Sequence, residues 1–207
     1  MKLDQRGLLI VISGPSGVGK GTVRNSLFKR SDHDMVYSIS MTTRKPRNGE
    51  VDGRDYYFVS EEEFLERIEQ GKFLEYAKFI DNYYGTPLDK LEEQLANGNE
   101  VVLEIEINGA MQVKKKRPDA IFIFIAPPTL DDLNERLHKR GTESEEIIQE
   151  RCQKAVKELA MANLYDYIVV NDDVDNAADK ILAIVRAEHA RTNRCLEEYN
   201  KIIRGVK

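Results

Sequence analysis

The feature that most constrains the fold is the stretch from residue 8 to residue 22, LLIVISGPSGVGKGT, in which an apolar run gives way to glycines and then to a lysine. This order predicts a buried strand, a tight loop and the start of a helix. Gly14, Gly19 and Lys20 fit the G-x-x-x-x-G-K pattern of a phosphate-binding loop, whose backbone N–H groups surround a polyphosphate. The positive N-terminal end of the helix adds to that site. We therefore predict a nucleotide-phosphate site, in which Lys20 offsets charge on the bridging phosphates.

The loop departs from the strict pattern at one position. Gly21 follows Lys20, where Ser or Thr usually supplies a magnesium ligand, and the hydroxyl of Thr22 comes one place later. Thr22 is therefore the nearest candidate for a magnesium ligand, on a weaker basis than a strict match would give. The alternative for the whole stretch is a glycine-rich turn that only joins a strand to a helix.

Composition limits the class of protein. The chain has 207 residues and a net charge of −5, so we expect one α/β domain that binds neither nucleic acid nor membrane surfaces. Cys152 and Cys195 have no metal-site spacing, and we expect His33, His138 and His189 at the surface for the same reason. No apolar run approaches about 18 residues, so neither a signal peptide nor a membrane span is expected. The expectation is a soluble cytoplasmic protein.

Apolar strands alternate with helices along the rest of the chain. Residues 100–107, 120–125 and 167–170 are rich in apolar side chains, which is typical of parallel strands covered on both faces. Short strand-like pieces between residues 55 and 87 predict a small inserted β-rich subdomain. We therefore predict an α/β fold with a parallel sheet, helices on both faces and an active crevice at the carboxyl ends of the strands. One long helix is expected over about residues 175–203.

Two groups of charged residues follow strands of this predicted sheet. The loop over residues 41–50 carries Arg44 and Arg47 beside hydroxyls. It is either a solvated connection or a second anion site, since arginine binds phosphate bidentately. Glu104 and Glu106 end an apolar strand. They either emerge into solvent or face the metal and the reacting phosphates.

Three arginines surround a short glycine-containing loop near residue 141. Arg136 and Arg140 lie one helical turn apart, and Arg151 belongs to the next predicted helix, over about residues 144–161. Arginines paired with glutamates on surface helices need no function. Beside a phosphate loop, however, they favour a lid that closes over phosphates, because phosphoryl transfer requires cations around the transferred group.

Eight segments carry a resemblance that covers nearly the whole chain, from about residue 7 to residue 191. They are GPSGVGKGT at 14–22, SMTTRKPR at 40–47, GEVDGRDY at 49–56, NYYGT at 82–86, EIE at 104–106, IAPP at 125–128, RGTE at 140–143 and VND at 170–172. In this combination the chain closely resembles the guanylate kinase family of P-loop nucleoside monophosphate kinases. The resemblance implies Mg²⁺-dependent transfer of the γ-phosphoryl group of ATP to GMP, giving ADP and GDP in purine metabolism. dGMP is a further candidate acceptor.

The resemblance also implies a division of the chain and a set of site residues. It implies a core of about residues 1–34, 88–138 and 162–207, a GMP-binding insertion of about 35–87, and a lid of about 139–161. The implied ATP-binding residues are Gly14, Pro15, Ser16, Gly17, Val18, Gly19, Lys20, Gly21, Thr22 and Asn171. The implied GMP-binding residues are Ser40, Arg44, Arg47, Tyr56, Glu75, Tyr84, Thr86, Glu104 and Glu106. The implied catalytic cations are Lys20, Arg44, Arg136, Arg140 and Arg151.

Glu75 is expected to select the base. Guanine presents N1–H and N2–H₂ donors that one carboxylate accepts, whereas adenine has an acceptor at N1 and leaves a buried carboxylate unpaired. Many family members have Ser at the position of Gly21 and Asp at that of Glu106. The longer Glu106 side chain leaves open whether it contacts metal and GMP directly or through water.

Two other functions are alternatives. One is a catalytically inactive guanylate-kinase-like module that binds other proteins; such modules typically have degraded phosphate loops, whereas Gly14, Gly19 and Lys20 are present here. The other is a kinase for a different nucleoside monophosphate, against which Glu75 argues. The expected partners are the nucleotides ATP and GMP, with no nucleic acid and no membrane, and a homo-oligomer is left open.

Overall fold

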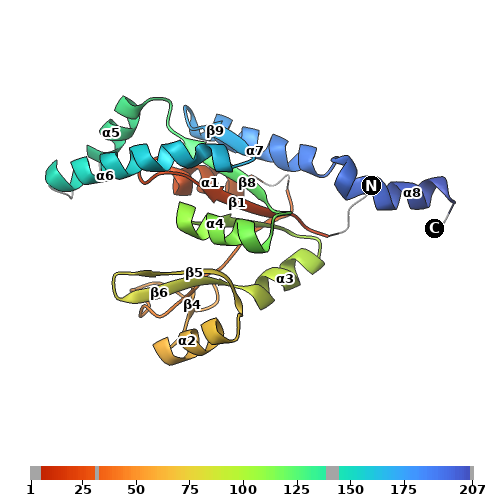
Figure 1. The fold of residues 1–207 in the computed structure, drawn as a ribbon, viewed down its shortest axis with the longest axis horizontal. Helices are drawn as coiled ribbons and strands as arrows, with labels where there is room; N and C mark the ends of the chain where they lie inside the picture. The colour runs from red at the N-terminus through yellow and green to blue at the C-terminus, as the bar shows by residue number, and fades with distance from the viewer. Residues whose placement is uncertain (1–5, 31–32, 139–144, 206–207) are drawn as a thin grey trace.

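Two sheets organise the computed structural model, which describes residues 6–30, 33–138 and 145–205 (Figure 1). The larger sheet has five strands in the order β2-β7-β1-β8-β9, and every pairing in it is parallel. These strands are β1 (Leu9–Ser13), β2 (Met35–Tyr37), β7 (Glu100–Glu104), β8 (Ile121–Ala126) and β9 (Tyr167–Val170). The predicted parallel α/β sheet is therefore confirmed.

Helices cover both faces of this sheet because its strands are apolar on both sides. Ile10 and Ile12 of β1 face one core, with α1 (Lys20–Lys29), α5 (Leu130–His138), α6 (Glu145–Leu159) and α7 (Val174–Glu188). Leu9 and Val11 alternate to the other core, with α3 (Leu88–Ala96) and α4 (Ile107–Lys116). A 3₁₀ turn (Ala160–Leu164) leads from α6 towards β9. No helix within the described ranges has the length and apolarity to cross a bilayer.

The smaller sheet forms the insertion, with strand order β4-β3-β6-β5. Its elements are β3 (Met41–Thr42), β4 (Tyr57–Phe58), α2 (Glu61–Glu69), β5 (Phe73–Phe79) and β6 (Asn82–Pro87). Phe64 of α2 is fully buried and stacks on Phe73 with 4.3 Å between ring centroids. The hydroxyl of Ser60 caps α2 by accepting a hydrogen bond from the Glu63 N–H at 3.1 Å. The insertion therefore has its own apolar centre.

The start of the insertion differs from the expected boundary near residue 35. Met35–Tyr37 form β2, which pairs with β7 at the edge of the large sheet, and the second sheet begins only with β3 at Met41. Two short strands of different sheets, β2 and β3, therefore lie on either side of residues 38–40. The edge of the large sheet takes the first one because β7 would otherwise lack a neighbour on that side.

The expected single C-terminal helix is wrong, because the structure divides it into α7 and α8 (Thr192–Ile203). Between them Arg191 adopts an extended conformation (ψ 132°). The break lies where His189 turns inward, with its Nε2 at 2.9 Å from Oε1 of the buried Glu100. The surface expectation is therefore wrong for His189, and α8 extends past the end of α7 (Figure 1).

His33 is also partly buried, contrary to expectation, whereas His138 is exposed. The Nε2 atom of His33 lies 2.9 Å from the Leu27 carbonyl oxygen at the end of α1, and its Nδ1 accepts the Met35 N–H at 3.1 Å. His33 therefore connects α1 to β2. Hydrophobic periodicity gives no signal for such polar contacts.

Candidate active site

The phosphate loop follows β1 and ends where Gly19 caps α1. Gly14 has φ 153° and Gly19 has φ 91°, backbone conformations that favour glycine. A Cβ atom at Gly14 would lie 2.3 Å from the carbonyl oxygen of Ile125, and one at Gly19 would lie 2.6 Å from Nδ2 of Asn171. The backbone of β8 therefore leaves no room for a side chain at Gly14, and a side chain at Gly19 would displace the Asn171 amide.

The N-terminal end of α1 is open towards this loop. No side chain caps the helix, and no acidic residue lies in its first turn. The first N–H groups of a helix have no partners within it, and the helix dipole adds positive potential there. This end of α1 therefore has the properties of an anion site.

Lys20 is the first residue of α1 and reaches back over the loop. Its Nζ donates to the carbonyl oxygens of Gly14 at 2.6 Å and Pro15 at 3.1 Å. Burial lowers the pKa of Lys20, and the nearby Glu106 and Glu104 carboxylates raise it in part. The ammonium is thus largely withdrawn from water and held where a polyphosphate would lie.

Residues from three distant elements contact the same loop. Arg136 of α5 donates from Nη1 to the Val18 carbonyl oxygen at 3.3 Å and from Nη2 to the Asn171 carbonyl oxygen at 3.0 Å. The Asn171 amide donates to the Val18 carbonyl oxygen at 2.8 Å. Arg151 of α6 donates to Oγ of Ser16 at 2.6 Å. The structure thus brings together the predicted cations Lys20, Arg136 and Arg151.

Part of the predicted lid has no structural account. Arg140 and the loop 141–143 lie outside the described residues. The helices on either side of this gap, α5 and α6, each contribute an arginine to the phosphate loop.

The predicted phosphate-binding group of the insertion is assembled around Arg44. Its Nη1 and Nη2 atoms donate to the two carboxylate oxygens of Glu50, each at 2.9 Å, and its guanidinium carbon lies 5.4 Å from the ring centroid of Tyr56. The hydrogen bond to Glu50 raises the pKa of Arg44. The Arg47 backbone N–H donates to Glu50 at 2.7 Å, and its side chain is exposed. Tyr84 completes the group, 6.1 Å from the Tyr56 ring.

Two of the residues assigned to GMP binding, Glu75 and Thr86, are hydrogen-bonded to each other. Glu75 of β5 is only 6% exposed, and the hydroxyl of Thr86 on β6 donates to its Oε1 at 2.7 Å. Burial raises the pKa of Glu75, and hydrogen bonds from Thr86 lower it in part. A Cβ atom at Gly109 of α4 would lie 2.9 Å from the Oε2 atom of Glu75. Ser40 is half-buried, and its carbonyl oxygen accepts the Tyr57 N–H at 2.9 Å.

The acidic pair lies at the carboxyl end of β7, but the strand is shorter than expected. β7 ends at Glu104, and Glu106 is the N-cap of α4, which begins at Ile107. Glu106 is exposed, whereas Glu104 is partly buried and its Oε2 lies 3.0 Å from Nη1 of Arg24. The two carboxylates therefore differ in surroundings although they are two residues apart.

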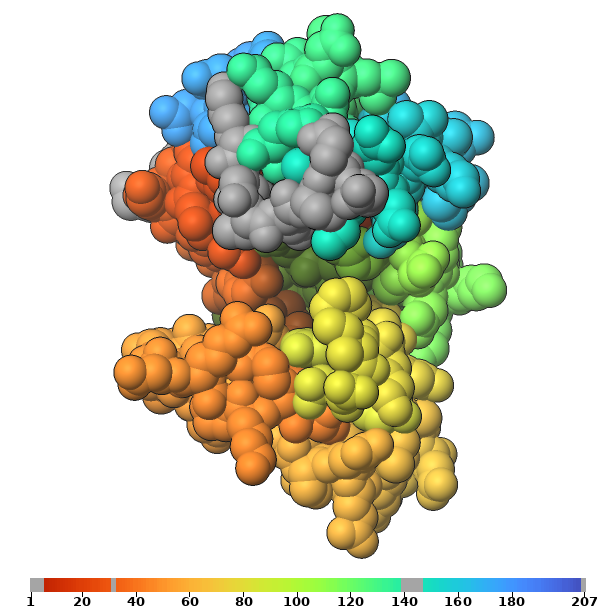
Figure 2. Space-filling model, turned by 90° about the vertical axis from the view of Figure 1, so that its left-hand side faces the viewer, coloured from red at the N-terminus to blue at the C-terminus, as the bar shows by residue number. Residues whose placement is uncertain are grey.

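The surface is hollowed between the insertion and the rest of the chain. Figure 2 shows this hollow between the insertion, coloured orange to yellow, and the rest of the chain above it. The phosphate loop belongs to the upper part, and Arg44 and Glu75 belong to the insertion. The arrangement offers one anion site on each side.

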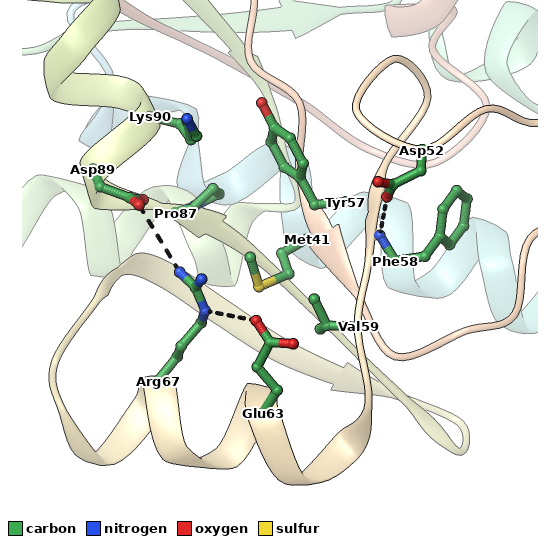
Figure 3. A pocket seen from close by; sticks show the side chains of 10 residues that line it. All are labelled: Met41, Asp52, Tyr57, Phe58, Val59, Glu63, Arg67, Pro87, Asp89 and Lys90. Atoms are coloured by element: carbon green, nitrogen blue, oxygen red, sulfur yellow. Dashed lines mark hydrogen bonds and ion pairs between the residues drawn. The ribbon is translucent and has the colours of Figure 1, made fainter.

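A second pocket lies between the insertion and the start of α3, and no predicted site residue lines it (Figure 3). It is lined by Met41, Asp52, Tyr57, Phe58, Val59, Glu63, Arg67, Pro87, Asp89 and Lys90, with a volume of about 190 Å³. Arg67 pairs across it with Glu63 at 3.2 Å and Asp89 at 3.9 Å. Small-molecule pockets usually enclose about 300 Å³ or more, so this pocket is not part of the candidate site.

Thr22 is the nearest candidate for a magnesium ligand near the phosphate loop. Among the described residues, no group of three or more His, Cys, Asp or Glu side chains is placed to hold a metal ion. Thr22 is exposed in the first turn of α1. This donor set fits an ion held mainly by nucleotide phosphates and water rather than by a protein cage.

Three residues near the site were missed by the sequence interpretation. Arg24 had a usable signal, because it lies four residues after Lys20 and so on the same face of α1. Glu50 lies in the same loop as Arg44, but a charge in a loop gives no indication of its partner. Gly109 is an unfavourable helix residue whose reason, the contact with Glu75, only the structure reveals.

Comparison with known proteins agrees with this geometry. Residues 6–188 match the family model described as guanylate kinase. The curated guanylate kinase of Aster yellows witches'-broom phytoplasma is 57% identical to this chain, over 98% of this chain and 97% of that protein. The curated guanylate kinase of Listeria monocytogenes is 55% identical, over 99% of this chain and 100% of that protein. A crystal structure of guanylate kinase from Anaplasma phagocytophilum superposes with a TM-score of 0.71 at 36% identity, over 92% of this chain and 90% of that one. The chain belongs to the guanylate kinase family.

Proposed function

We propose that this chain transfers the γ-phosphoryl group of ATP to GMP in the hollow between the phosphate loop and the insertion, in purine nucleotide metabolism. The observation that supports this most directly is the convergence of Lys20, Arg136 and Arg151 on a loop whose helix N-terminus is uncapped. Such a cluster of cations neutralises the negative charge around a transferred phosphoryl group. dGMP is proposed as a second acceptor.

ATP is assigned to the core side. The backbone of the loop from Gly14 to Thr22 binds the phosphates, with Lys20 along the bridging oxygens, and Asn171 borders the adenine. Thr22, water and the phosphates would hold Mg²⁺, which supplies charge neutralisation on the β- and γ-phosphates. The Lys20 contacts with loop carbonyl oxygens support this, because a phosphate at the loop would replace them as partners of a buried ammonium.

GMP is assigned to the insertion side. Its phosphate is bound by Arg44, Arg47, Tyr56 and Tyr84, and Glu50 pre-orients the Arg44 guanidinium. Its base is read by Glu75, with further assigned contacts from Ser40, Thr86, Glu104 and Glu106. The carboxylate of Glu75 accepts hydrogen bonds from the N1–H and N2–H₂ donors of guanine.

The mechanism depends on positioning rather than on a general base. The attacking oxygen belongs to the GMP phosphate, which is already anionic, so no protein group has to remove a proton. Lys20, Arg44, Arg136, Arg140 and Arg151 are assigned to stabilise the charge on the transferred group. The insertion and the lid are proposed to close over the hollow and exclude water. We place the reaction in the cytoplasm.

A substrate panel tests the proposal. ADP formation from Mg-ATP would be measured with GMP, dGMP, AMP, CMP and UMP, using the unaltered chain, Lys20→Ala and Lys29→Ala. Lys29 ends the same helix and is exposed, so its variant controls for loss of a lysine from α1. We expect turnover with the guanine nucleotides alone, a fall of about a hundredfold or more for Lys20→Ala, and no change for Lys29→Ala. Folded protein without turnover on any nucleotide would favour the inactive module instead.

A further inference from the structure

Arg24 is held on three sides beside the phosphate loop. It lies on α1 one turn after Lys20, and its Nη1 is 3.0 Å from Oε2 of Glu104, at the end of β7. Its guanidinium carbon lies 4.7 Å from the ring centroid of Tyr37, at the end of β2. Its Nε and Nη2 donate to Oδ1 of Asn25 at 3.3 and 3.0 Å. The arginine therefore links α1 to the carboxyl ends of two strands.

The ion pair between Arg24 and Glu104 lies beside Gly21. A Cβ atom at Gly21 would lie 3.7 Å from Oε1 of Glu104 and 3.9 Å from Nη2 of Arg24, which are ordinary van der Waals distances. The ion pair thus packs against the first turn of α1, at the position where a strict phosphate loop carries Ser or Thr. Glu104 consequently lies close to the phosphate loop.

Glu104 has a second cation within its electrostatic reach. Its carboxylate is one of those that raise the pKa of Lys20. Lys20 has to stay over the phosphate loop to meet phosphates, and an unpaired Glu104 would attract its ammonium away from the loop. The side chains of Arg24 and Glu104 are 28% and 17% exposed, so solvent screens their pairing less than it screens an exposed pair.

We propose that Arg24 is a positioning residue for phosphoryl transfer. It holds the Glu104 carboxylate on the acceptor side of the hollow and keeps it from pairing with Lys20. Arg24 itself acts through Glu104 and touches neither nucleotide. The proposal rests on the proposed function, in which Glu104 contributes to the GMP site.

The first test separates kcat from KM in single variants. Arg24→Gln should lower kcat/KM for GMP about ten- to a hundredfold, through both kcat and KM, because the carboxylate is misplaced. The KM for ATP should stay within about twofold, and Arg24→Lys should recover part of the loss because it restores the charge. Arg30→Gln is the control: it removes the arginine directly after the end of α1, which pairs with Asp179 of α7, and the kinetics of this variant should not change.

The second test combines Arg24→Gln with Glu104→Gln. If Arg24 acts through Glu104, the double variant should be no worse than Glu104→Gln alone, since a neutral amide needs no counter-ion. Multiplying effects would overturn the proposal, as would unaltered kinetics of either single variant. Failure of the proposed function would be seen separately, as absence of GMP turnover by the unaltered chain. That result would refute the role of Arg24 together with the proposed function.

Discussion

Replacing Glu75 by Gln tests the base-reading site with almost no change in shape. The amide oxygen of Gln can still accept the Thr86 hydroxyl, which now lies 2.7 Å from Oε1 of Glu75. The other carboxylate oxygen becomes an NH₂ group, which donates. Guanine presents donors on its N1 and N2 atoms, so an acceptor facing them would be replaced by a donor.

The magnitude follows from the burial of this group. Glu75 is 6% exposed, so water cannot replace the lost partner. Loss of a hydrogen bond to a charged group costs about 1.5–3 kcal/mol, and a buried donor without an acceptor adds about 1–3 kcal/mol. A total of about 3–5 kcal/mol corresponds to a fall in kcat/KM for GMP of roughly a hundredfold to a few thousandfold. Selectivity over AMP should fall with it.

The free energy of unfolding should move in the opposite direction. Burial raises the pKa of Glu75, so the folded state binds its proton more tightly than the unfolded state. The folded state is therefore penalised as the pH rises from the unfolded carboxyl pKa, about 4.5, through the raised folded value. Glu75→Gln removes this penalty. Its Tm should equal or exceed that of the parent at neutral pH, and the difference should shrink in acid.

Two assays on the same samples decide the matter. ADP formation gives kcat/KM for GMP and for AMP, and circular dichroism gives Tm at neutral and acidic pH. Glu63→Gln is the control, because Glu63 is an exposed glutamate of the same insertion that pairs with Arg67 on α2 (Figure 3). GMP use equal to that of the parent would refute the role of Glu75. A Tm several degrees lower at neutral pH would refute the argument from burial.

Three further substitutions probe the packing around the site. Gly109→Ala should raise the KM for GMP, because the new methyl group displaces the flexible end of Glu75. It should not lower Tm, because alanine favours the helix. Steady-state kinetics and thermal unfolding measure the two effects. Gly21→Ser fits at ordinary contact distances and should raise Tm by a degree or two with activity retained, and a large loss of turnover would show that the space is needed. Phe64→Ala should destabilise the insertion by about 3–5 kcal/mol, seen as faster hydrogen exchange in β5; equal protection would contradict the separate apolar centre.

The ends of two helices have local causes. Ser60 caps α2 through a hydroxyl three residues from its partner N–H, and Gly98 ends α3 with φ 82°. Both features depend on neighbouring residues only, so they can be predicted from the local sequence. The long C-terminal helix was wrong because its periodicity continues through residues 189–191, where the tertiary contact of His189 with Glu100 accompanies the break.

The sequence by itself determined the phosphate loop, the parallel sheet with its two apolar faces, and the family. These depend on short patterns and on the alternation of apolar residues, which require no knowledge of distant partners. Only the tertiary structure decided which cations reach the loop, since Arg136 and Val18 are 118 residues apart, and Arg151 and Ser16 are 135 apart. It also decided that Arg24 holds Glu104 and that Gly109 lies against Glu75. Polar contacts of this kind have no periodicity, and they arise only when packing of the core brings separate elements to the same edge of the sheet.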